Sequence, residues 1–206
     1  MKLPFFTYRL FWHLENFWGK SSEEDDDPWN SYFPIQFTGN PIKNRQNCNL
    51  ETNNHQYFLD ECNFFDDNNR VIYFYPIENS LFLHNRCSFS NCISKEDGTC
   101  IYYVIGSNSS IVQRKFCCTK CQSSKSGQFS YTEVDTDNLN FFIESSLFDV
   151  GSESVGGNTF RAISDNIVVS STNYSSCKAP NQPVGLFQCP SPVSYTHLTL
   201  PTTERV

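Results

Sequence analysis

The chain has 206 residues, enough for one substantial domain or two small ones, and its formal net charge is −7. Its basic residues are scattered, which argues against a surface for nucleic acid or for an anionic membrane. No stretch reaches the roughly 20 apolar residues that a membrane-spanning helix requires. The 19 Phe, 10 Tyr and 3 Trp supply large side chains for an ordered core.

Residues 1–19, MKLPFFTYRLFWHLENFWG, predict an aromatic-rich helix. Apolar side chains such as Phe6 and Trp18 form a wide stripe, and Gly19 stands where a helix C-cap glycine occurs. Arg9 interrupts the apolar run and no small-residue cleavage site follows, so a secretory signal fits poorly. We therefore expect a helix that packs in a larger domain rather than one that lies in a membrane interface.

Residues 20–47 have the composition of a connector, with an acidic run from Glu23 to Asp27 and three prolines. The spaced ligands and the turn glycine of a calcium-binding EF-hand loop are missing, so we assign the acidic run no ligand role.

Residues 48–192 predict a β-rich domain. Ile101 to Ile105 is a β-branched and aromatic run between Gly98 and Gly106, which is typical of a short buried strand. The turn at Asp66–Asn69 predicts a hairpin whose second arm is Val71 to Tyr75. Together with the N-terminal helix, these segments predict an α+β fold stapled by disulfides. Further strands are expected at residues 129–134, 139–143 and 167–169.

The ten cysteines allow two chemistries. One is a disulfide framework in an oxidising compartment, and the other is a tetrahedral zinc site built from Cys87-x4-Cys92 and Cys118-x2-Cys121. An even number of cysteines favours disulfides, as does the adjacent pair at 117 and 118, whose side chains face opposite ways in a strand. We therefore predict disulfides, and neither a metal nor a cofactor, for Cys48, Cys62, Cys87, Cys92, Cys100, Cys117, Cys118, Cys121, Cys177 and Cys189.

Two glycosylation sequons support the same compartment, because they are usable only in a secreted protein. They begin at Asn108 and Asn173.

The sequence does not predict an enzyme. Only His55 and His84 lie in segments with clear structure, and no cysteine stands apart beside a histidine as a nucleophile would. His84 is expected at the surface, at the end of a strand.

The last fourteen residues, 193–206, need a separate explanation. Reading Val193 to Thr202 back into codons produces what looks like the transposon-end adapter used in sequencing libraries. We therefore interpret this tail as an artefact and expect it to have no packing partner.

The order of these features resembles the C-terminal (δ) region of the α2δ auxiliary subunit of voltage-gated calcium channels, over about residues 5–190. In that family an aromatic-rich helix precedes an acidic stretch, then a cysteine, a threonine and an aromatic pair, then a close cysteine pair, a hydrophobic strand, a tight cysteine group, and two cysteines around prolines. The matching residues are Cys48, Thr52, Tyr57, Phe58, Cys87, Cys92, residues 101–105, Cys117, Cys118, Cys121, Cys177, Pro180, Pro183 and Cys189.

The resemblance implies a non-enzymatic role at the extracellular face of the plasma membrane. By it, the chain would bind the pore-forming channel subunit, promote its surface delivery and tune its gating. Cys189 would bond to the α2 portion upstream, and membrane attachment would come from sequence not in this chain. Two alternatives stay open: another secreted, disulfide-rich adhesion or receptor-binding domain, and an intracellular zinc-binding module.

Overall fold

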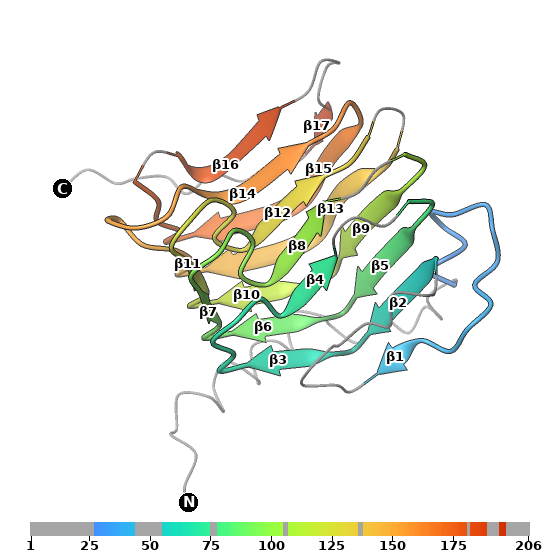
Figure 1. Ribbon diagram of the computed structural model, residues 1–206, viewed down its shortest axis with the longest axis horizontal. Helices are drawn as coiled ribbons and strands as arrows, with labels where there is room; N and C mark the ends of the chain where they lie inside the picture. The colour runs from blue at the N-terminus through green and yellow to red at the C-terminus, as the bar shows by residue number, and fades with distance from the viewer. Residues whose placement is uncertain are drawn as a thin grey trace, which may run out of the picture.

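The computed structural model describes residues 27–43, 55–74, 78–104, 107–135, 138–180, 182–188 and 194–196. Across these residues the chain is a parallel β-solenoid of about 4 turns, without a helix (Figure 1). The predicted α+β class is therefore wrong, because the chain is all-β where it is described. The helix expected at residues 1–19 lies outside the described residues. No described segment forms a helix with the length and apolar character needed to cross a bilayer.

The described strands form three sheets, and every strand pair is parallel. Sheet A contains β1 (Ile42–Lys43), β2 (Gln56–Asp60), β3 (Asn63–Phe65), β5 (Leu81–Asn85), β6 (Ser88–Ser90), β9 (Ser110–Arg114), β10 (Cys117–Thr119), β13 (Asn140–Phe148), β15 (Ile167–Ser175) and β17 (Ser194–Thr196). Sheet B contains β4 (Ile72–Phe74), β8 (Ile101–Val104), β12 (Ser130–Glu133), β14 (Asn158–Ile163) and β16 (Gln182–Gln188). Sheet C contains β7 (Ile93–Ser94) and β11 (Gln122–Ser123).

The register shows how one turn follows another. Ile72 pairs with Ile101 and Ile101 pairs with Ser130, so a turn takes 29 residues at this point. The predicted hairpin is wrong, because β4 pairs with β8 of the next turn and β3 pairs with β6. The polar residues between β3 and β4 form a corner of the coil, where the chain passes from sheet A towards sheet B (Figure 1).

One corner of sheet A is built from non-glycine residues in the left-handed backbone conformation. Their φ angles lie between 46° and 56°, and hydrogen bonds between successive turns continue through the corner, as from the Glu61 amide to the Asn85 carbonyl at 3.1 Å. A positive φ is costly for such residues, so repeating it turn after turn requires support from the neighbouring turns. The residues are Glu61, Arg86, Lys115, Glu144 and Ser171.

Aromatic rings fill the interior of the coil. Phe116 and Phe129 stack with ring centroids 4.9 Å apart, and Phe160 contacts Phe129, Phe142 and Tyr174 at 4.8 to 5.4 Å. Alternation of buried and partly exposed residues in β8 and β12 directs every second side chain into this core. The aromatic composition therefore serves a core made of stacked layers.

Residues 27–41 cover the outer face of sheet A, before the chain enters the sheet as β1. Trp29 is fully buried there, and its indole Nε1 donates a hydrogen bond of 2.7 Å to the Ile35 carbonyl. It packs in a cluster with Phe58, Leu83 and Val112, which lie in register on β2, β5 and β9. The described part of the predicted connector is thus a packed cover over three turns.

Three residues of the tail form β17, which pairs with Val168 to Ser170 of β15. The expectation that the tail has no packing partner is therefore wrong for Ser194–Thr196, while its adapter origin stays a prediction.

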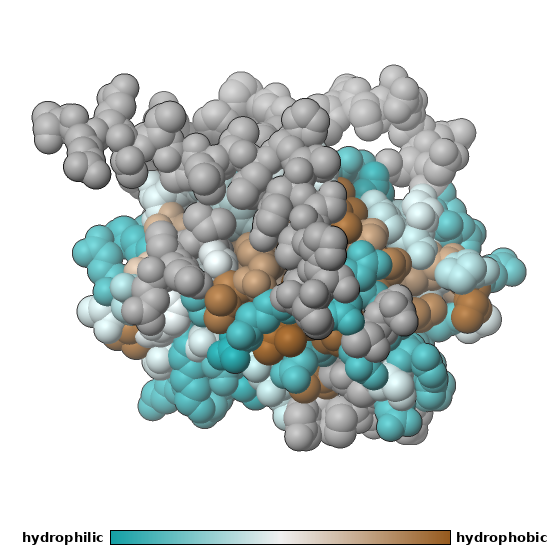
Figure 2. Space-filling view, turned by 90° about the horizontal axis from the view of Figure 1, so that it is seen from above, coloured by the Kyte–Doolittle hydropathy of each residue, from teal (hydrophilic) through white to brown (hydrophobic). Residues whose placement is uncertain are grey.

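Figure 2 shows the molecule from above, where hydrophobic residues reach the surface among hydrophilic ones.

Candidate functional site

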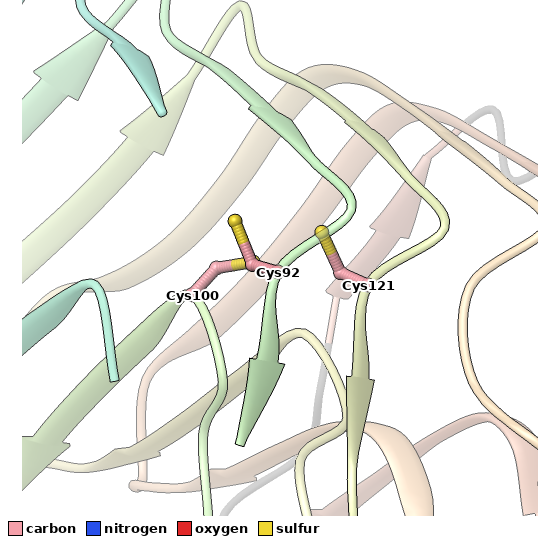
Figure 3. Close-up of side chains that lie close together, drawn as sticks. All are labelled: Cys92, Cys100 and Cys121. Carbon is pink, nitrogen blue, oxygen red and sulfur yellow. The ribbon is translucent and has the colours of Figure 1, made fainter. Parts of the chain in front are cut away.

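Three buried thiols meet where sheet C joins the rest of the coil (Figure 3). Cys92 and Cys121 stand just before β7 and β11, and because Ile93 pairs with Gln122, the two cysteines are neighbours on consecutive turns. Cys100 stands just before β8. All three are 0% exposed, and their Sγ atoms lie within 4.8 Å of one another.

A fourth buried thiol, from Cys118 on β10, adjoins this group. It is 2% exposed and interacts electrostatically with the thiols of Cys100 and Cys121, but it is not one of the three thiols whose Sγ atoms all lie within 4.8 Å of one another. Cys92, Cys100, Cys118 and Cys121 are called the thiol cluster below. Two of its members belong to one turn and two to the next.

The environment separates the proton affinities of these thiols. Burial raises the pKa of Cys100 well above the usual value. For Cys92, the hydrogen bond with Cys100 lowers the pKa, but the hydrogen bond with Cys121 and burial outweigh it and raise the pKa to about 12. For Cys118, burial is the largest single influence and raises the pKa, but the interactions with Cys100 and Cys121 together outweigh it, so the pKa is lowered.

The predicted disulfides stay a prediction. None of the eight described cysteines is in a disulfide in this structure, and Cys48 and Cys189 lie outside the described residues. Cys117 is half-buried, on the opposite side of its strand from Cys118. Cys177 is partly buried and follows β15; the amide of the next residue, Lys178, donates a hydrogen bond to the Val150 carbonyl.

Cys87 does not join the thiol cluster. Because Asn63 pairs with Ser88, Cys87 lies beside Cys62 of the preceding turn, and the two thiols interact electrostatically. Burial raises the pKa of Cys87 well above the usual value. The zinc alternative drawn from the sequence therefore counted Cys87 among the four ligands, whereas in the structure Cys100 lies with the other three cysteines.

The two sequon asparagines are exposed. Asn108 has a φ of 59° in a turn, and its Nδ2 donates a 3.3 Å hydrogen bond to Asn79 Oδ1. Asn173 points outward from β15. Both are accessible for glycosylation, whose use stays a prediction.

The surface position expected for His84 is wrong. His84 is fully buried, with Nε2 3.4 Å from Gln113 Oε1, and burial lowers its pKa to about 3. Its position on β5 places it inside the coil, in register with Leu59 and Gln113. His55 is exposed, and its Nδ1 lies 3.2 Å from the Glu78 carbonyl.

A second candidate site lies on the outer side of sheet B. Tyr73, Tyr102 and Tyr131 pair in register on β4, β8 and β12, with neighbouring ring centroids 5.4 and 5.3 Å apart. Arg70 lies over two rings, 4.0 Å from the centroid of Tyr102 and 5.1 Å from that of Tyr73. Arg161 lies 5.2 Å from the centroid of Tyr131. These five residues are called the tyrosine–arginine column.

Sequence reasoning missed both sites because it missed the repeat. The segments NCISKEDGT and KCQSSKSGQ, at residues 91–99 and 120–128, share a cysteine and a glycine at equal spacing. The runs IYYV and SYTE follow them and become β8 and β12. Self-similarity at a fixed period of this length indicates a solenoid and would have predicted both the register and the column.

Compared with protein-family models, with curated proteins and with solved structures, the chain matches none of them.

Proposed function

We propose that this chain is a non-enzymatic recognition module, which binds a protein partner through the tyrosine–arginine column. The observation that carries the proposal is the alignment of three tyrosines on neighbouring strands of sheet B. The Arg70 guanidinium lies over Tyr102 and Tyr73, and that of Arg161 lies over Tyr131. Tyrosine and arginine dominate the binding energy of protein interfaces and are enriched there relative to the remaining surface.

The column is held in place before any partner binds. Its tyrosines stand on a hydrogen-bonded sheet, and Arg70 Nε donates a 2.7 Å hydrogen bond to the Asp97 carbonyl. Tyr73 is 51% exposed, and Tyr102 and Tyr131 are half-buried. Because ordering flexible side chains costs binding free energy, a surface already ordered in this way favours recognition.

The chemistry of the described residues supports a binding role over catalysis. The neutral imidazole of His84 is sealed in the core, and Gln113 is its hydrogen-bond partner. The thiols of Cys87, Cys92 and Cys100 are buried with raised pKa values, which is the setting of structural rather than nucleophilic cysteines.

This role corresponds to the adhesion or receptor-binding alternative that the sequence left open. The part in a calcium-channel auxiliary subunit stays a prediction. That prediction depends on the order of the cysteines along the chain. The 29-residue repeat of the solenoid explains part of that order in another way, because Cys92 and Cys121 occupy equivalent positions of consecutive turns. An extracellular location likewise stays a prediction, supported by the exposure of Asn108 and Asn173.

Site-specific photocrosslinking tests the proposal. A photoreactive amino acid at position 102 should yield a discrete covalent adduct with a cellular protein, whereas one at position 65 should not. Phe65 is the matched control, because it is an exposed aromatic residue of sheet A, 49% exposed.

The captured protein, once purified, should bind the natural chain and a Phe65→Ala variant equally. Tyr131→Ala should weaken binding by about 30-fold, since truncating an interface hot spot costs about 2 kcal/mol. Equal affinity of Tyr131→Ala and the natural chain would refute the column as the binding surface.

A further inference from the structure

We propose that the thiol cluster binds one thiophilic divalent cation, Zn²⁺ in the cell, in a closed tetrahedral site that joins two consecutive turns of the solenoid. This site is separate from the tyrosine–arginine column and does not depend on the proposed recognition role. Its ligands are Cys92, Cys100, Cys118 and Cys121.

The separation of the sulfur atoms suits such an ion. Sulfur atoms on one tetrahedral zinc lie about 3.8 Å apart, because each Zn–S bond measures about 2.3 Å. The Sγ atoms of Cys92, Cys100 and Cys121 already lie within 4.8 Å of one another. Binding therefore requires these three thiols to approach one another by no more than about 1 Å, and the adjoining thiol of Cys118 to turn towards them as the fourth ligand, which rotation of the side chains can supply.

The ligand types select the ion. The group consists of cysteines alone, with no histidine or carboxylate among the described residues that complete it. Thiolates favour zinc and other thiophilic ions, whereas calcium and magnesium take oxygen ligands. Cys118-x2-Cys121 also has a ligand spacing found in structural zinc sites.

The arrangement of contacts favours one shared ion over two disulfides. The Sγ atoms of Cys92, Cys100 and Cys121 all lie within 4.8 Å of one another, and the thiol of Cys118 interacts electrostatically with all three. A disulfide would use one of these contacts per sulfur, whereas a tetrahedral ion sits at the centre of all four. Metal binding releases the thiol protons, and a divalent cation then offsets two of the four thiolate charges in the apolar interior.

Burial makes the site structural rather than catalytic. Four protein ligands leave no position for water or substrate, and all four cysteines are at most 2% exposed. Cys92 and Cys100 come from one turn and Cys118 and Cys121 from the next, so the ion would fasten the two turns together.

Cobalt titration of the full chain tests this inference. The chain is purified reduced and metal-free, Co²⁺ is added, and the absorption of tetrahedral cobalt thiolate is recorded. The expected result is saturation at one Co²⁺ per chain, with displacement by one equivalent of Zn²⁺. Cys100→Ser should reduce the affinity for Co²⁺ at least tenfold, and Cys62→Ser, the matched buried cysteine outside the cluster, should not.

Two further measurements cover the case in which Cys100→Ser fails to fold. Circular dichroism reports whether each variant keeps its β structure, and ¹¹³Cd NMR of the natural chain counts the sulfur ligands without any variant. A cadmium resonance in the range of four thiolates supports the site. The inference is overturned if the natural chain binds no Co²⁺, if Cys62→Ser lowers the affinity as much as Cys100→Ser while keeping its β structure, or if peptide mapping of the cellular protein finds disulfides within the cluster.

Discussion

The burial and the pKa of an individual residue in this chain depend on the neighbouring turns of the coil. His84 is the clearest case, because the sequence places it at a strand end, where a surface position is expected, yet β5 directs it into the coil. Its neighbours there are the rings of Phe82, Phe89 and Phe116. Desolvation by these rings disfavours the imidazolium form.

His84 should therefore make the folded state sensitive to acid. Its pKa is about 3 when folded and near 6.5 when unfolded, so the unfolded chain binds an extra proton between these values. Stability is full above pH 6.5 and falls as the pH drops towards 3, by about 2 kcal/mol between about pH 7 and pH 5. Urea unfolding across this range should show the loss in the natural chain and in His55→Gln, the exposed control. A His84→Gln variant that loses stability with the same slope would contradict this assignment.

At the scale of elements, a short segment protects a whole column of outward-facing apolar side chains. Phe58, Leu83 and Val112 would be exposed on sheet A, since they alternate with the residues that face the core. Trp29 covers them, with its ring centroid 6.0 Å from that of Phe58 and 4.6 Å from that of Phe33. Burial of large rings on both sides of sheet A makes this part of the solenoid two layers deep.

Removing the indole should loosen that cover. Trp29→Ala is expected to lower the free energy of unfolding by about 3 to 5 kcal/mol, because it leaves a cavity and exposes apolar surface. Ile35→Ala is the control, since Ile35 is 56% exposed and should change stability by less than about 0.5 kcal/mol. Denaturant unfolding followed by circular dichroism measures both. Similar losses in the two variants would show that the cover contributes little.

At the scale of the whole molecule, each turn contacts chiefly the turns next to it. In such a fold the stability is close to a sum of turn energies and interface energies, and whole turns are exchangeable units. The backbone supports this view, because strand pairs join residues about one turn apart and the left-handed corners recur in register.

A deletion of one complete turn should therefore be tolerated. Removing residues 101–129 joins Cys100 to Ser130, which occupies the position of Ile101, so register is kept. We expect a folded chain with β circular dichroism and a shorter particle in small-angle scattering, but without Cys118 and Cys121 and hence without the cobalt site. Removing residues 101–115, about half a turn, should prevent folding. If both deletions unfold the chain alike, its turns are not independent units.

The sequence alone determined where several strands form, because the preference of β-branched and aromatic residues for strands is local. The strand expected at Ile101 to Ile105 is β8, and that expected at residues 129–134 contains β12. The sequence also indicated that residues 117 and 118 face opposite ways, which the burial of Cys118 and the partial exposure of Cys117 confirm.

Only the tertiary structure decided which strands pair and which thiols meet. The hairpin at Asp66–Asn69 was wrong because a polar turn between two strands looks alike in a hairpin and at a solenoid corner, and the partner of β4 lies 29 residues away along the chain. For the same reason Cys87 was grouped with Cys92 by proximity in sequence, whereas the coil brings Cys100 and Cys118 together from different turns. Side-chain neighbours in a solenoid are set by the period of the coil, and no local preference of a residue contains that period.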